Sequence, residues 1–131
     1  MTRILPNTEK HLAEQVALYL QSLGLLYRFD IAADLVLTIG QAKRNKLLHP
    51  RRGFPDLIIY KACGGFHALV VELKREGEKI YKKDGLTPVT THIAEQLEFL
   101  EDLDAEGYEA HMVVGFQEFK QVVDSYLKSS L

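Results

Sequence analysis

Residues 53–74 read GFPDLIIYKACGGFHALVVELK, which is two short apolar runs joined by a segment that contains a glycine pair. The runs Asp56–Tyr60 and His67–Lys74 are rich in β-branched and other apolar residues, as strands are. The glycine pair between them favours a tight turn. The sequence therefore predicts a β-hairpin in this part of the chain.

The predicted hairpin brings charged side chains together. If the turn centres on the glycine pair, antiparallel pairing places opposite one another residues whose numbers sum to roughly 128 to 130, so Asp56 lies beside Glu72. Side chains alternate along a strand, so Lys74 shares the face of Glu72, whereas Leu73 points into packing on the other face. We therefore expect two acids and one ammonium to converge.

Such a cluster favours a divalent cation. Two neighbouring carboxylates raise one another's pKa unless a cation lies between them. Oxygen ligands of this kind suit Mg²⁺ or Mn²⁺. The alternative is that Asp56 and Glu72 are solvated charges at a sheet edge. The abrupt change from the apolar run Ala68–Val71 to charged residues favours the metal site, because charges next to a buried strand need partners.

Composition limits the number of domains, the cellular compartment and the partners that the sequence allows. The chain has 131 residues, of which 47% are hydrophobic and 26% charged, so we expect one globular domain over residues 1–131. The formal net charge of −2 gives no global attraction to nucleic acid. Cys63 is the single cysteine, which excludes an internal disulfide and favours a reducing, cytoplasmic compartment. No membrane partner is expected, because no apolar stretch approaches the roughly 18 residues of a span and no signal-peptide pattern is visible.

Hydrophobic periodicity and turn signals predict an α/β fold. A first helix runs to about Ser22, a second covers residues 91–104, a strand follows at 111–115, and a closing helix covers 117–127. Residues 25–40 contain two apolar patches, which could be a strand followed by either a strand or a short helix. The predicted order is α-β-β-β-α-β-α.

Each of the two longer helices carries a polar residue on its apolar face. Glu9 precedes Leu12 and Val16 at helical spacing, so it should face inward, whereas Glu14 falls on the opposite face. Glu9 could equally be a first-turn acid that favours the helix N-terminus. Gln96 lies on the apolar stripe of the second helix, where a buried amide needs either backbone partners or the polar cluster on the hairpin.

A basic segment precedes the hairpin. Its cations lie close to Asp56 in the sequence, where they could bind phosphates without reading bases. Such a run is also common in solvated loops. The expected DNA-binding residues are Lys43, Arg44, Lys46, Arg51 and Arg52.

The ordered set of motifs resembles the VRR-NUC family of PD-(D/E)XK nucleases, in its stand-alone phage and bacterial form. The resemblance covers most of the chain. It implies a restriction-endonuclease-like core, in which a central mixed β-sheet is flanked by helices. The residues that carry it are Thr8-Glu9-Lys10, Arg52-Gly53-Phe54-Pro55-Asp56-Leu57, Glu72-Leu73-Lys74, Asp84-Gly85, His92, Gln96, Gly107-Tyr108 and Tyr126-Leu127.

The resemblance also implies a site and a chemistry. Mg²⁺ or Mn²⁺ would be held by Asp56, Glu72 and the Leu73 carbonyl, with help from Glu9 directly or through water; whether Glu9 or Glu14 is the acid of the first helix stays open. Lys74 would orient the attacking water or neutralise the phosphate, and Gln96 would hold Lys74 or that water. The expected catalytic residues are Glu9, Asp56, Glu72, Lys74 and Gln96.

The implied function is metal-dependent cleavage of structured DNA in a bacterium or a phage-infected host. Stand-alone members are implied to be homodimers that resolve four-way (Holliday) junctions. The alternatives are a non-catalytic nucleic-acid-binding module that retains the nuclease fold and a sheet protein without a nucleic-acid partner.

Overall fold

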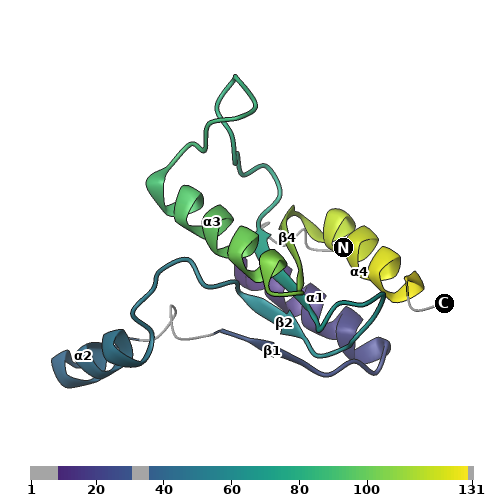
Figure 1. Cartoon of the computed structure of the whole chain (residues 1–131), viewed down its shortest axis with the longest axis horizontal. Helices are drawn as coiled ribbons and strands as arrows, with labels where there is room; N and C mark the ends of the chain where they lie inside the picture. Colours follow the sequence, from purple (N-terminus) through teal and green to yellow (C-terminus); the bar gives the residue numbers. More distant parts are fainter. Residues whose placement is uncertain (1–8, 31–35, 130–131) are drawn as a thin grey trace, which may run out of the picture.

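The computed structural model describes residues 9–30 and 36–129 of the chain (Figure 1). One four-stranded sheet carries helices on both of its faces. The elements in chain order are α1 (Glu9–Ser22), β1 (Tyr27–Phe29), α2 (Ile39–Leu48), β2 (Leu57–Ile59), β3 (Leu69–Lys74), α3 (Thr91–Ala105), β4 (Glu109–Val114) and α4 (Phe116–Lys128).

The sheet is mixed, with the strand order β1-β2-β3-β4. The first three strands are antiparallel, whereas β4 runs parallel to β3 after the crossover through α3. The predicted hairpin is confirmed: Leu57 pairs with Val71, which puts Asp56 opposite Glu72. The turn closes through a 2.9 Å hydrogen bond from Phe66 N to Cys63 O.

The main core lies between the sheet and the pair α1 and α4. Both helices turn an apolar stripe toward the face on which the odd-numbered residues of β2 and β3 lie, as strand alternation requires. The opposite face of β3 is covered by α3. The buried residues of the main core are Leu12, Val16, Leu20, Leu57, Ile59, Cys63, Leu69, Val71, Leu73, Val113, Phe119, Val123 and Tyr126.

The regular elements after the hairpin follow the sequence prediction closely. The helix predicted over 91–104 ends at Ala105, and it begins after Thr90, whose side chain accepts a 3.1 Å hydrogen bond from Ile93 N. The strand predicted at 111–115 begins two residues earlier, at Glu109. The closing helix extends the predicted bounds by one residue at each end. Apolar periodicity was sufficient here because each element buries one face.

The interval left open by the sequence, residues 25–40, contains a strand and the first two residues of a helix that continues through the basic segment to Leu48. The first apolar patch is β1, whereas most of the second patch, residues 31–35, lies outside the described residues. The predicted order lacked α2, although the fold class is confirmed. No apolar stripe in the sequence predicts this helix. None of its residues is buried by the part of the chain that the structure describes. Its one sequence signal is a capping box formed by Thr38 and Gln41.

Within the described ranges, no helix is long and apolar enough to cross a membrane. Cys63 is a free thiol and is buried beneath the hairpin turn.

Candidate active site

Asp56 is held by a loop that is pressed against α3. Gly53 has a φ of +88°, and a Cβ at this position would lie 2.8 Å from the Glu95 carbonyl oxygen. Phe54 makes an edge-to-face contact with Phe99 of α3, with ring centroids 5.2 Å apart. The loop can approach the helix backbone this closely only because residue 53 lacks a side chain.

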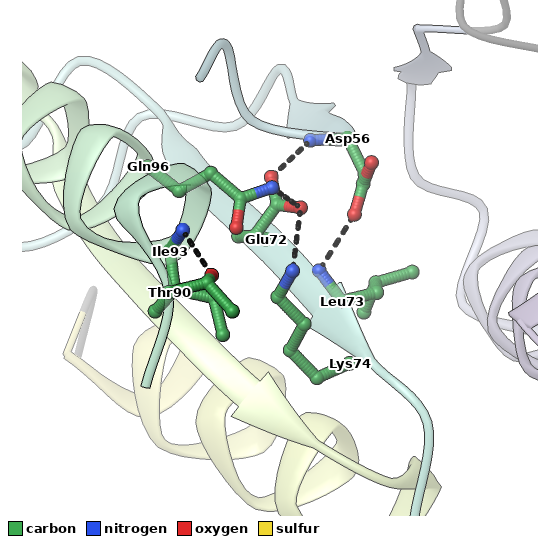
Figure 2. A network of polar contacts seen from close by, with 7 residues as sticks. All are labelled: Asp56, Glu72, Leu73, Lys74, Thr90, Ile93 and Gln96. Atoms are coloured by element: carbon green, nitrogen blue, oxygen red, sulfur yellow. Dashed lines mark hydrogen bonds and ion pairs between the residues drawn. The ribbon is translucent and has the colours of Figure 1, made fainter. Parts of the chain in front are cut away.

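The two carboxylates are joined by backbone hydrogen bonds across the β2–β3 pair (Figure 2). Asp56 N donates to Glu72 Oε2 at 3.2 Å, and Leu73 N donates to Asp56 Oδ2 at 2.9 Å. Glu72 and Lys74 are 3% and 5% exposed, so both charges lie inside the protein. Because buried charges are stable only with partners, this arrangement is not a solvated sheet edge.

Gln96 reaches the cluster from α3 (Figure 2). Its Nε2 donates to Glu72 Oε1 at 2.8 Å, and Lys74 Nζ lies 3.8 Å from the same oxygen. The sequence left open whether the Gln96 amide bonds to backbone groups or to the polar cluster on the hairpin. In the structure its hydrogen-bond partner is Glu72 of the hairpin. Gln96 Oε1 is buried and accepts no hydrogen bond from any residue in the described ranges. A buried acceptor of this kind calls for a further donor, such as water or substrate.

The carboxylates bind protons tightly when no cation is present. Burial, followed by the charge of Asp56 and a hydrogen bond with it, raises the pKa of Glu72 to about 9. Burial also raises the pKa of Asp56, although hydrogen bonds from Glu72 and Leu73 N and the charge of Lys74 act in the opposite direction. When both are ionised, Asp56 and Glu72 therefore carry more negative charge than the one nearby ammonium of Lys74 can balance.

This donor set fits Mg²⁺ or Mn²⁺. Two close carboxylates with raised pKa values gain from a divalent cation that replaces their protons. Mg²⁺ commonly takes one or two protein carboxylates and completes its shell with water and phosphate oxygens. Asp56 and Glu72 could supply those two ligands. No group of three or more His, Cys, Asp or Glu side chains suited to a metal occurs among residues 9–30 and 36–129.

The structure leaves the acid of the first helix open. Glu9 is the first residue of α1, but its side chain lies outside the described part of the chain. Glu14 is exposed on α1, as its position on the polar face predicted. A role for the Leu73 carbonyl stays a prediction, because the described contact to Asp56 comes from the Leu73 N–H.

The basic residues divide into groups with different surroundings. Lys43, Arg44 and Lys46 are exposed on α2, and Arg52 is exposed beyond it. Arg51 instead contacts α3. Its guanidinium lies 2.6 Å from the Asp102 carboxylate and stacks over the Phe99 ring, 4.3 Å from the ring centroid.

One residue near the site was missed by the sequence prediction. Asp30, at the end of β1, donates its N–H to Asp56 O at 2.8 Å, and its charge contributes to the raised pKa of Asp56. The sequence signal that could have identified Asp30 is its position directly after β1, the strand that pairs with β2. The strand was too short to be assigned a register from sequence.

Comparison with known proteins bears on the family resemblance and on the fold. The chain is similar to a solved structure of a VRR_NUC domain protein, with 28% sequence identity and a TM-score of 0.55 over 78% of this chain and 67% of the other. No protein-family model matches the sequence. No curated protein matches it in sequence. The structural match confirms the resemblance to the VRR-NUC family and the restriction-endonuclease-like α/β fold.

Proposed function

We propose that this chain, whose fold is that of a VRR-NUC domain, is a divalent-metal-dependent endonuclease that hydrolyses phosphodiester bonds in branched DNA. Its similarity to a VRR_NUC domain protein indicates a nuclease-type function. The observation that carries the proposal is the buried cluster of Asp56, Glu72, Lys74 and Gln96. Burial raises the pKa of both carboxylates there, and the Gln96 amide oxygen accepts no hydrogen bond from the described residues. A purely structural role would not require such costly groups.

Asp56 and Glu72 would hold the cation, with the Leu73 carbonyl and Glu9 as further expected ligands. A divalent cation bound there supplies a Lewis acid that lowers the pKa of a water molecule and offsets the negative charge of the phosphoryl group. The backbone N–H groups of Asp56 and Leu73 fix the two carboxylates against each other. The ligand oxygens are therefore oriented before substrate arrives, which favours the transition state over the ground state.

Lys74 brings a positive charge to the same face of the sheet. Its ammonium is buried beside Glu72, and its side chain is held by the central strand. In our proposal it donates to the attacking water or to a phosphate oxygen, and so positions the nucleophile or the scissile phosphate. The low dielectric of the site makes this charge more effective than one in bulk water.

Gln96 acts as a positioning residue. Its Nε2 fixes Glu72, while Oε1 is free to accept a hydrogen bond from Lys74 or from the attacking water. The amide can thus orient one donor relative to the carboxylate pair. This role explains why a polar side chain lies on the apolar stripe of α3.

DNA would be held by the basic residues of the segment before Asp56. The net charge of −2 requires such a local contact, since the molecule as a whole does not attract phosphates. We further propose that two copies act together, because two equivalent sites at a fixed separation suit paired cuts in a four-way junction. The cytoplasm is the compartment that a single free cysteine suits.

The test is Mn²⁺-dependent cleavage of a labelled panel that contains a four-way junction, a flap and a linear duplex. We expect symmetric junction cuts by the wild type. Asp56→Asn and Lys74→Ala should each lower the cleavage rate at least about 100-fold, because the first removes a carboxylate that would hold the cation and the second removes a positive charge next to the reacting phosphate. DNA binding should fall much less.

Glu118→Gln is the matched control, since it removes an exposed carboxylate from the first turn of α4, away from the carboxylate pair. Its cleavage rate should equal that of the wild type. Cutting of flap or duplex alone would retain the nuclease and reject the junction substrate. Bound DNA that is never cut, together with no heat of Mn²⁺ binding, would favour the non-catalytic module.

A further inference from the structure

Helix α2 projects from the body of the molecule (Figure 1), and none of its residues is buried by the described residues of the chain. Ile39, Leu47 and Leu48 are 79%, 80% and 61% exposed, and Val36 just before the helix is fully exposed. Isolated helices shorter than about 12 residues are marginal in water, so a ten-residue helix normally depends on packing. Residues 9–30 and 36–129 do not bury these apolar side chains, and exposed apolar patches of this kind are typical of interaction sites.

A groove of about 660 Å³ lies on the other side of α3 from the connector that carries α2. It is bordered by the loop before α3, by α3 itself and by β4, which is an edge strand of the sheet. Its surface combines apolar side chains with acids. The groove residues used here are Leu86, Leu97, Met112, Glu98, Glu101 and Asp104.

The charges of the helix and the groove are opposite. The acids that line the groove are Glu98, Glu101 and Asp104, whereas residues 39–48 contain three bases and no acid. At about 100° per residue, Ile39, Lys43 and Leu47 share one face of α2, and Lys46 borders it. This mixture of apolar and basic side chains matches the mixture in the groove. DNA phosphates would satisfy the lysines but would leave the apolar side chains uncovered.

The groove of the same chain is an unsuitable site for α2. The connector that follows α2 is fixed to α3 through the contact of Arg51 with Asp102 and Phe99. At about 100° per residue, Phe99 lies about 160° around α3 from Leu97, and Asp102 lies about 160° from Asp104. Leu97 and Asp104 line the groove, whereas Glu98 borders both the groove and the connector. The end of α2 is therefore tethered on the flank of α3 that faces away from the groove.

We propose that α2 of one copy docks into the acidic and apolar groove of a second copy, and that the second copy returns the same contact. The proposal rests on the pairing of copies suggested above and adds the surface that mediates it. A reciprocal contact of this kind closes a two-fold dimer. It assigns Lys43 and Lys46 to the partner, while Arg44, about 100° around the helix from Lys43, and Arg52 stay available for phosphates.

Charge reversal tests the contact. We would measure molar mass by light scattering over a concentration series, without DNA or metal. Lys43→Glu/Lys46→Glu and Glu98→Lys/Glu101→Lys should each raise the dimer dissociation constant at least about 100-fold, because like charges then meet across the contact. The protein that combines all four changes should regain the wild-type dimer. Leu47→Asp should give a monomer whose circular dichroism spectrum loses no more helical signal than the unfolding of the ten-residue α2 explains.

A wild type that is monomeric at all concentrations, or reversed variants that keep the wild-type mass, would overturn the proposal. Reversed variants that keep their mass but lose DNA binding would show instead that α2 is a nucleic-acid contact. Because mass is measured without substrate, this outcome is separate from that of the cleavage test. An inactive dimer would reject the nuclease function and keep the interface, whereas an active monomer would do the opposite.

Discussion

At the residue scale, the most consequential feature is that Glu72 is a buried acid whose pKa is raised to about 9. Near neutral pH, the metal-free protein keeps a proton on the carboxylate pair. Cation binding must displace that proton, so metal affinity increases as pH rises. The affinity of this site for a metal ion should therefore depend on pH, because the carboxylates that would bind the ion also bind protons.

The same pKa predicts how stability depends on pH. Between the ordinary value of 4.5 and about 9, folded metal-free protein binds more protons at Glu72 than unfolded protein does. The free energy of unfolding therefore falls as pH rises through this window. We expect the Tm of the metal-free protein to fall from pH 5 to pH 9 and Mn²⁺ to restore it most strongly near pH 9, as measured by thermal denaturation.

Glu72→Gln is the decisive variant, because it removes the titrating group and keeps an oxygen for Gln96 Nε2 to contact. Its Tm should vary less with pH than that of the wild type and should respond weakly to Mn²⁺. Glu118→Gln, which changes an exposed acid, should behave as the wild type does. Equal pH slopes in all three proteins would contradict the assignment.

The meeting of Asp56 with Glu72 could be predicted from sequence because one glycine turn fixes the register of the whole hairpin. The position of Lys74 followed from alternation. The contact of Gln96 with Glu72 could not be derived in the same way, because it depends on how α3 crosses the sheet. The approach of Asp30 depends on the register of a three-residue strand, which the sequence did not specify.

At the scale of the elements, the site depends on how the loop before β2 contacts α3. Gly53→Ala would place a Cβ 2.8 Å from a backbone oxygen that cannot move without shifting the helix. We expect a loss of roughly 1–3 kcal/mol in the free energy of unfolding, together with a lower cleavage rate because Asp56 is displaced. Chemical denaturation and the junction assay would measure the two effects.

Gly65→Ala provides the control. Gly65 has nearly the same φ, +87°, but an added Cβ there meets no atom within 4 Å. Its loss of stability should be smaller, since only backbone strain is added, and its cleavage rate should be close to that of the wild type. If both variants lost cleavage equally, the contact of the loop with α3 would not be what positions Asp56.

Among the elements, α2 is the one that the sequence did not predict. Elements that bury a face, such as α3 and α4, were predicted because burial imposes a periodic pattern. Helix α2 buries no residue within its own described chain, so its sequence carries no such pattern. If its packing surface lies on a second molecule, no reading of one chain alone would have assigned it.

At the scale of the whole molecule, a net charge of −2 has to be reconciled with the DNA substrate that we propose. The cations of the segment before β2 supply the local positive charge. Arg52→Ala should weaken DNA binding evenly across sequences and reduce the slope of log K against log salt by about 0.9, the value for one phosphate contact. Fluorescence anisotropy in the Asp56→Asn background, without metal, would measure this slope.

Lys128→Ala removes an exposed cation from the last turn of α4 and should leave the slope unchanged. The prediction fails if the Arg52→Ala and Lys128→Ala proteins show the same salt dependence. Arg51→Ala is less informative, because it also removes the contact with Asp102 and Phe99.

Strand β3 carries Glu72 and Lys74 and is buried along its whole length, with a neighbouring strand on each side. Backbone amides in such a strand exchange with solvent only when the sheet as a whole comes apart. The proposed catalytic groups Glu72 and Lys74 therefore lie in the part of the protein that should open last. Heating should therefore disturb exposed elements such as α2 well before it stops the proposed reaction. The arrangement of Glu72 and Lys74 should be lost only when the whole protein unfolds.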